Sequence, residues 1–176
     1  EQTRDQAKIG QIIGQHNPHL IPRGLPGEGN LLVFDNGGQG GYGFANPARP
    51  DGTNAMTRDS SRVLEINPVT LEVVWEYTLG GTERYRFYSA YVSNAQRLPN
   101  GNTLVNEGMD GRIFELTTEE EIVWEYVNPF LSDDDTPSRR IYRAYRVPYD
   151  WIPQVTQPTE NAVIPPELKN FRVPSY

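Results

Sequence analysis

The sequence contains no cysteine, which excludes disulfide bridges, thiolate metal ligands and a cysteine nucleophile. Histidine is nearly absent as well, since His16 and His19 are the two histidines among 176 residues. This scarcity argues against a multi-histidine metal centre, and we expect neither a bound metal nor a cofactor. Positive charge is in deficit: the net charge of −7 argues against nucleic acid as a partner. No apolar run is long enough to cross a bilayer, and no signal peptide is visible.

The residues that are abundant favour β-strands. The chain holds 10 Tyr, 3 Trp, 16 Gly and 15 Pro, with short runs of Val, Ile and Leu between the glycines and prolines. Aromatic and β-branched residues fit a pleated sheet, and Gly and Pro mark the turns between strands. A length of 176 residues suits one domain with a substantial core. The composition therefore predicts an all-β protein.

An internal repeat organises the chain. Segments in the first half recur about 50 to 72 residues later, and the larger interval reflects extra residues inside the first copy. A third copy begins late in the chain, where Ile141–Tyr145 resembles Phe87–Tyr91. The matching pairs in the first two copies are Gly29–Val33 with Gly101–Val105, Arg62–Ile66 with Arg112–Leu116, and Val74–Tyr77 with Val123–Tyr126.

Each copy reads as four short antiparallel strands. In the second copy we expect strands at 87–98, 102–107, 112–116 and 122–126. The pair Asn100-Gly101 is a strong two-residue hairpin signal between the first two of them. Tandem four-stranded units with an aromatic outer strand are typical of β-propeller blades, and a sandwich of the same strands would not require a tandem repeat. We therefore predict β-propeller blades in a partial ring.

The predicted organisation has three parts. Residues 1–131 form two blades, the first carrying a long insertion at 37–60; residues 132–150 supply the first strand of a further or closing blade; residues 151–176 form an extended proline-rich tail. Two blades cannot close a ring, because repeat units bury their faces only against neighbours. Glu1 is also not a natural start. We therefore expect the remaining blades to come from a longer chain or from partner subunits.

The most reactive candidate lies on the first strand of the first copy. In propellers, first strands line the central channel, where ligands bind. Aligning the three first strands places His16 opposite Ser93 and Val147, and of these His16 alone is strongly reactive. On this pattern, His16 is either a catalytic residue or a histidine that merely forms hydrogen bonds in the channel.

A family resemblance bears on this choice. Gln15-His16, Leu20 and Gly29–Gly37 resemble the segment around the active-site histidine of the bacterial aryl-sulfate sulfotransferases, and the likeness extends over about residues 12 to 150. The resemblance implies a six-bladed propeller, of which this chain is the C-terminal part, working without a nucleotide sulfate donor. It implies that His16 attacks an aryl sulfate and passes the sulfuryl group to a phenol. It also implies a periplasmic or secreted protein.

Further site residues are expected around His16. Charge on the transferred sulfuryl group calls for cationic or hydrogen-bonding partners. Arg143 is the preferred donor, ahead of Arg86, and Asn17 and Asn36 are expected near His16. Tyr88 is the candidate for stacking on the aryl ring, whereas the strand spacing places His19 on the opposite face from His16. The rival hypothesis is a non-catalytic propeller that serves as a binding or structural subunit.

Overall fold

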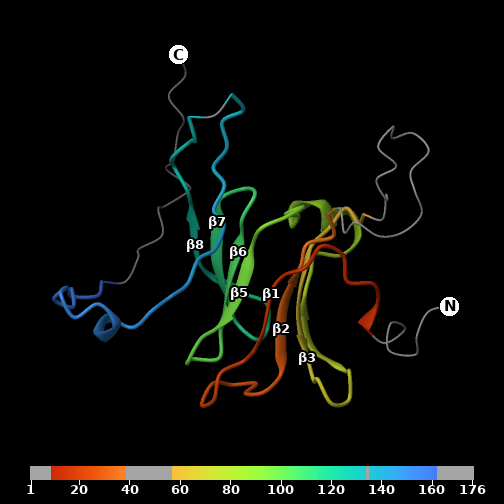
Figure 1. The fold of residues 1–176 in the computed structure, drawn as a ribbon, viewed down its shortest axis with the longest axis horizontal. Coiled ribbons are helices and arrows are strands. Elements are labelled where there is room, and N and C mark those ends of the chain that lie inside the picture. The colour runs from red at the N-terminus through yellow and green to blue at the C-terminus, as the bar shows by residue number, and fades with distance from the viewer. Residues whose placement is uncertain (1–8, 39–56, 134, 162–176) are drawn as a thin grey trace, which may run out of the picture. The chain divides into compact units, whose positions relative to one another are not determined.

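The computed structural model describes residues 9–38, 57–133 and 135–161. In these ranges the chain forms two four-stranded antiparallel sheets and two short 3₁₀ helices (Figure 1). The chain divides into two compact units, Glu1–Arg146 and Val147–Tyr176, and both sheets belong to the first. The predicted all-β class is confirmed.

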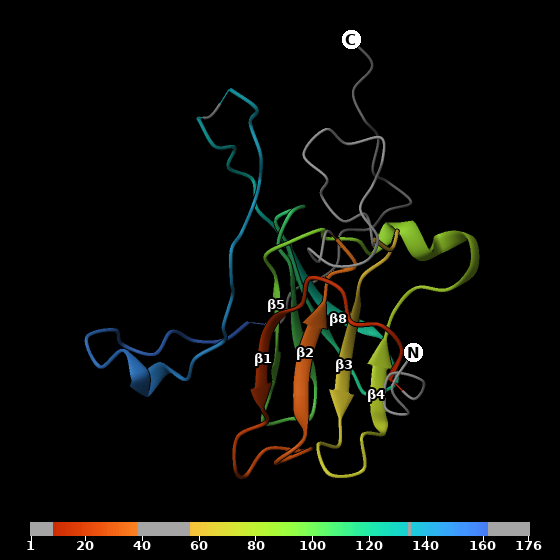
Figure 2. The same cartoon turned by 45° about the vertical axis from the view of Figure 1, so that its right-hand side comes forward.

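Sheet 1 contains the first copy of the repeat. Its strands follow one another in chain order, as Figure 2 shows. The predicted insertion at 37–60 joins the second strand to the third, and residues 39–56 of it lie outside the described residues. The strands are β1 (His16–Leu20), β2 (Leu31–Asp35), β3 (Arg62–Ile66) and β4 (Val73–Tyr77).

Sheet 2 contains the second copy, in the same order. The turn at Asn100-Gly101 forms as expected, with Gly101 at φ +91°, a conformation that glycine adopts at little cost. The first strand is shorter than predicted, because Val92 and Ser93 take positive φ angles that interrupt the ladder. The elements are helix η1 (Gly81–Arg86), β5 (Asn94–Arg97), β6 (Thr103–Glu107), β7 (Arg112–Leu116) and β8 (Ile122–Val127).

One hydrophobic core joins the two sheets. Phe87 is fully buried at its centre, and its ring lies 5.6 Å from Phe34, 5.0 Å from Tyr77 and 5.9 Å from Phe114, measured between ring centroids. The edge-to-face and tilted geometries are those that aromatic pairs prefer. The remaining core residues are Leu32 and Val63 from sheet 1, Ile21 just after β1, and Ala95, Val105 and Leu116 from sheet 2. The sheets are therefore held in a fixed relation to each other.

The opposite face of sheet 1 is covered by the segment that leads into β1. Val33, Leu64 and Ile66 are buried there beneath the half-buried side chains of Ile9 and Ile12. After β8 in the sequence, the described residues include a single turn of 3₁₀ helix, η2 (Tyr149–Trp151). Residues 162–176 of the predicted tail lie outside the described residues. Within the described ranges, no helix has the length and apolar character needed to span a membrane.

Candidate active site

His16 stands at an irregular point of sheet 1, where β1 begins. Gly14 and Asn17 on either side take φ angles of +62° and +51°, and the pairing with β2 shifts between His16 and His19. Such a bulge inserts an extra residue into one strand and redirects the neighbouring side chains. A non-glycine residue at positive φ stores strain of about 1–3 kcal/mol, and such residues cluster at functional sites.

Both ring nitrogens of His16 have hydrogen-bond partners. The Nδ1 atom lies 2.7 Å from Asn36 Oδ1 and 3.1 Å from the Gly14 carbonyl oxygen, and both of these atoms are acceptors. The Val92 N–H donates to Nε2 over 3.2 Å. The proton of the neutral ring therefore sits on Nδ1, and the lone pair sits on Nε2.

Asn36 fixes this assignment. It is fully buried, and its amide NH₂ donates to the carbonyl oxygens of Ser89 at 2.7 Å and Val92 at 2.9 Å. Those two contacts identify which end of the amide is nitrogen, so the opposite end must accept the His16 proton. The Asn36 backbone carbonyl is engaged as well, by the Ser61 hydroxyl at 2.7 Å. The side-chain amide of Asn36 is thus fully engaged within the chain.

Val92 is held in a strained conformation against this pair. Its φ angle is +59°, in the left-handed region that a β-branched residue rarely adopts, and its side chain is buried. The Val92 N–H donates a hydrogen bond to His16, and the Val92 carbonyl oxygen accepts one from the Asn36 amide. The turn that precedes β5 is therefore shaped to close on the histidine.

Two buried serines fix the same turn to sheet 2. The Ser93 hydroxyl donates to Ser89 Oγ over 2.8 Å, and the Ser89 hydroxyl donates to the Tyr91 carbonyl over 2.9 Å. Each serine oxygen also accepts a backbone N–H, from Gly108 and Met109 respectively. Every hydroxyl proton is thereby committed, which stabilises one geometry of the turn.

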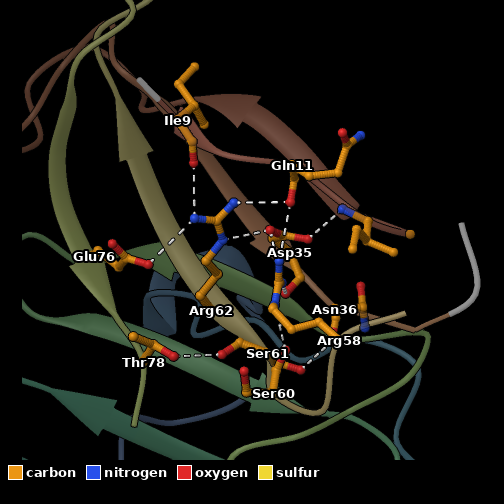
Figure 3. Close-up of polar contacts among 12 residues, drawn as sticks. Ile9, Gln11, Asp35, Asn36, Arg58, Ser60, Ser61, Arg62, Glu76 and Thr78 are labelled. Carbon is orange, nitrogen blue, oxygen red and sulfur yellow. Dashed lines mark hydrogen bonds and ion pairs between the residues drawn. The ribbon is translucent and has the colours of Figure 1, made fainter. Parts of the chain in front are cut away.

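Asp35, the residue before Asn36, anchors the segment that enters β1 (Figure 3). Its buried carboxylate accepts the Ile13 N–H at 2.8 Å and forms ion pairs with Arg62 at 2.7 Å and Arg58 at 3.0 Å. A buried carboxylate needs such partners to offset its lost hydration. Both arginines also donate to the Gln11 carbonyl. Asp35 therefore positions the chain on one side of His16, while Asn36 positions its ring.

Glu107 occupies the matching place at the end of β6 in sheet 2. Its carboxylate accepts the Tyr88 N–H at 2.9 Å and pairs with Arg112 at 3.2 Å, as Asp35 does with Ile13 and Arg62. Burial raises the pKa of Glu107, and the Tyr88 N–H and Arg112 oppose that rise. In both sheets, therefore, an acidic residue at the end of the second strand binds the segment that leads into the first strand.

Asn17 lies beside His16, as the sequence predicts. It is half-buried, its amide donates to the Ala95 carbonyl at 3.5 Å, and its Oδ1 accepts the Tyr145 hydroxyl at 3.2 Å. Tyr145 was not predicted, because nothing in its local pattern relates it to a strand 128 residues away. The structure thus brings a phenol hydroxyl next to the first strand.

The expected orientation of His19 is wrong. The register pairs His16 with Phe34 and His19 with Leu32, two residues apart on β2, so both histidines project from one face of the sheet. The bulge causes this, because three steps along β1 oppose two along β2. His19 Nδ1 lies 2.9 Å from the Asn17 carbonyl oxygen, which is a local contact.

The two candidate arginines lie away from His16. Arg143 is exposed, with its guanidinium 5.2 Å from the centre of the Tyr142 ring. Arg86 belongs to η1 rather than to a strand, and pairs there with Glu83 at 2.5 Å. Neither arginine contacts His16 in the described part of the chain. Sequence alignment places Arg86 on a first strand, but it does not record that η1 forms there instead.

Tyr88 lines a hollow of about 650 Å³. Its other described lining residues are Thr57, Arg58, Asp59 and Tyr85. Arg58 also holds Asp35, so the hollow adjoins the network that positions β1. His16 is not among the described lining residues.

Within the described ranges, no group of three or more histidine or acidic side chains is arranged to hold a metal ion. The fold and the site define an all-β protein with a histidine held at the start of the first strand of a four-stranded sheet. The family model of arylsulfotransferase (ASST) matches residues 5–134, and the chain belongs to that family. No curated protein and no solved structure matches the chain.

Proposed function

We propose that the chain carries the nucleophile of an aryl-sulfate sulfotransferase, with His16 as that residue. Family membership supports sulfuryl transfer between phenolic compounds. The observation that carries the proposal is the His16–Asn36 contact, because a buried amide that binds the Nδ1 proton leaves the Nε2 lone pair as the reactive one. A neutral imidazole with a defined lone pair is a competent nucleophile near pH 7.

The reaction has two displacement steps at sulfur. In the first, the Nε2 lone pair bonds to the sulfur of the aryl sulfate, the bond between sulfur and the aryl oxygen breaks, and the phenolate leaves. In the second, the oxygen of an acceptor phenol bonds to the same sulfur and the nitrogen–sulfur bond breaks, while the phenol proton passes to solvent. Splitting the transfer lowers each barrier. Asn36 Oδ1 stabilises the positive charge that develops on the ring through the Nδ1–H bond.

The Val92 N–H has two roles in this scheme. It must release the Nε2 lone pair before attack, and it then lies beside the sulfuryl oxygens, which attract donors. Asn17 and Arg143 remain proposed sulfuryl contacts, and Tyr88 the proposed aryl contact. For Asn36 we propose a positioning role instead, since both polar atoms of its side chain are engaged within the chain.

Family membership also supports a proposal about the whole protein. We propose that these sheets are blades of a six-bladed propeller, that the other blades supply further sulfuryl-binding side chains, and that the protein is exported to the periplasm or beyond the cell. Aryl sulfates are the donors and phenols the acceptors.

Intact-mass spectrometry tests the nucleophile. The chain is mixed with 4-nitrophenyl sulfate, quenched at neutral pH and weighed; a sulfuryl adduct of about 80 Da is expected on the native protein. His16→Ala must abolish the adduct, and His19→Ala must keep it. An adduct that survives in His16→Ala assigns the chemistry to another residue and contradicts the proposal.

A second function is favoured by one specific observation. Both ring nitrogens of His16 are satisfied by the chain itself, which is the state of a purely structural histidine. In that case the chain is a non-catalytic binding or structural subunit. No adduct would form with the native protein, and His16→Ala would lower its stability without changing any reactivity.

A further inference from the structure

The chain holds one imidazole besides that of His16, and the bulge in β1 places it on the same face of sheet 1. His16 lies opposite Phe34 and His19 lies opposite Leu32, and both histidines are half-buried. Because Phe34 and Leu32 are two residues apart on β2, the Cα atoms of the histidines are about 7 Å apart along the sheet. Two imidazoles at this spacing can hold a transferred group and its acceptor between them.

The hydrogen bonds of His19 fix its tautomer. Its Nδ1 atom lies 2.9 Å from the Asn17 carbonyl oxygen, which can only accept, so Nδ1 carries the proton. The Asn17 side-chain nitrogen is 3.4 Å from the same atom, but this longer contact is the weaker one. The lone pair of the neutral His19 ring therefore sits on Nε2.

The two histidines differ at Nε2. That atom of His16 accepts the Val92 N–H, whereas Nε2 of His19 makes no hydrogen bond to any of the described residues. A proton gained there would make the His19 ring cationic and would strengthen the bond from its Nδ1–H to the Asn17 carbonyl oxygen. The His19 ring is therefore arranged to take up a proton and to stabilise the resulting charge.

A phenol already lies beside the two histidines. The Tyr145 hydroxyl donates to Asn17 Oδ1 over 3.2 Å, and Asn17 lies between His16 and His19 in β1. The structure thus shows that a phenol O–H, the group that a sulfuryl acceptor carries, fits at this place. Because the Tyr145 side chain is exposed, it can give way to a free phenol without opening the core.

The second step of the proposed reaction needs a proton acceptor. Phenols are largely protonated at neutral pH, and the oxygen attacks sulfur well only as its proton leaves. A positioned base typically accelerates such a step by about 10²- to 10⁴-fold. His16 cannot be that base, because its Nε2 lone pair is bonded to sulfur in the sulfohistidine and its Nδ1 already carries the proton bound by Asn36.

Resting on the function proposed above, we propose that His19 is the general base for the acceptor phenol. The phenol binds beside Asn17, and its hydroxyl hydrogen can rotate toward His19 Nε2. The proton passes to that atom while the phenol oxygen bonds to sulfur. The nitrogen–sulfur bond breaks, and its electron pair returns to His16 Nε2. His19 then releases the proton to solvent.

The first step makes a smaller demand on His19. The 4-nitrophenolate anion leaves without being protonated, so the adduct with 4-nitrophenyl sulfate forms without His19. By reversibility, the protonated His19 ring assists the departure of less acidic phenols. The role of His19 is therefore measured in the second step, with acceptors of different acidity.

Single-turnover transfer tests this role. The chain is loaded with 4-nitrophenyl sulfate, freed of excess donor and mixed with an acceptor, and the loss of the adduct is followed by intact-mass spectrometry. The acceptor 4-ethylphenol is protonated at neutral pH and needs a base, whereas pentafluorophenol is already ionised and serves as the matched control. The variant is His19→Gln, whose amide can still donate to the Asn17 carbonyl oxygen but cannot take up the proton.

His19→Gln should slow transfer to 4-ethylphenol by about 100-fold or more and leave transfer to pentafluorophenol unchanged. Free imidazole should restore part of the 4-ethylphenol rate in His19→Ala, where the truncated side chain leaves room for it. A merely structural histidine would affect both acceptors alike and would not respond to imidazole.

Two results would overturn the inference, and they are distinguishable. If the native chain takes up no adduct, the proposed function fails and this inference fails with it. If the adduct forms but His19→Gln slows both acceptors equally or neither of them, the inference about His19 alone is wrong.

Discussion

Asn36 Oδ1 accepts the Nδ1 proton of His16 over 2.7 Å, although the two residues are 20 positions apart in sequence. The contact is made possible by the β1–β2 pairing, which places His16 opposite Phe34 at the end of the hairpin. It joins the residue that the family resemblance singles out to a fully buried amide whose other bonds run to the turn before β5.

Asn36→Ala should change the tautomer of His16. Without the buried acceptor, the Nδ1–H form loses its preference, and the fraction of Nε2–H ring should rise. Long-range ¹⁵N–¹H correlation spectra, recorded at a pH where the His16 ring is neutral, report the tautomer directly. The His19→Gln variant assigns the signals of the two histidines. The Ser89 and Val92 carbonyls would also lose a donor, so stability should fall by about 1–3 kcal/mol. An unchanged tautomer would contradict the positioning role.

At Val92 a glycine variant should be more stable than an alanine variant, which reverses the order usual inside a strand. Both substitutions remove the buried side chain, but glycine tolerates the φ angle of +59° and alanine does not. Val92→Gly should therefore be more stable than Val92→Ala by about 1 kcal/mol in urea unfolding. Val105, inside β6, is the control site, where the glycine variant should be the less stable of the two. The same order at both sites would show that Val92 is not strained.

Arg97→Ala should be strongly destabilising. It would leave the buried Glu65 carboxylate with the Asn30 amide alone, at a cost of about 3–5 kcal/mol. Arg86→Ala, which breaks the exposed pair with Glu83, should cost far less stability, because solvent screens that pair. Urea unfolding of both variants decides the matter. Comparable losses would mean that the pair between the sheets is not the stabilising contact inferred here.

The two buried glutamates of sheet 2 should affect acid stability in opposite directions. Burial raises the pKa of Glu115, but hydrogen bonds from Asn102, Asn100 and Arg146 outweigh this and lower it below 4.5. Its stabilising contribution is therefore present above that value and is lost as the pH falls through the folded-state pKa. Glu107 has a raised pKa, so its contribution declines as the pH rises from 4.5 through the folded-state value.

Urea midpoints of three proteins, measured from about pH 3 to pH 7, check these signs. Glu115→Gln should flatten the loss of stability on the acid side relative to the native chain. Glu107→Gln should steepen it, because the native glutamate opposes that loss. A variant whose profile runs parallel to that of the native chain would show that the glutamate's pKa is the same in the folded and unfolded states.

Much of the fold could be predicted because its signals are local. The predicted strand at 112–116 coincides with β7, and those at 102–107 and 122–126 differ from β6 and β8 by one residue. Alternating apolar residues and the Asn100-Gly101 turn suffice for these elements. The closeness of His16 and Asn36 could likewise be predicted, since a hairpin brings both residues to the same end of the two strands.

What could not be predicted depends on register and on contacts between sheets. A bulge has no sequence signature, so the shared face of His16 and His19 was missed. The shortening of the first strand in sheet 2 follows from positive φ at Val92, which no pattern marks. Nothing in the sequence next to Arg97 or Arg146 distinguishes these residues from exposed arginines. Only the assembled sheets show that each binds a buried glutamate.

The hydrogen bond from Val92 to His16 joins the two sheets, because His16 opens β1 and Val92 leads into β5. A small rotation of one sheet against the other would therefore change the Nε2–Val92 separation before either sheet loses a strand. The availability of the histidine lone pair is thus coupled to the angle between the units. Under the proposed function, a neighbouring sheet that alters this angle would change how readily the Nε2 lone pair becomes free to react.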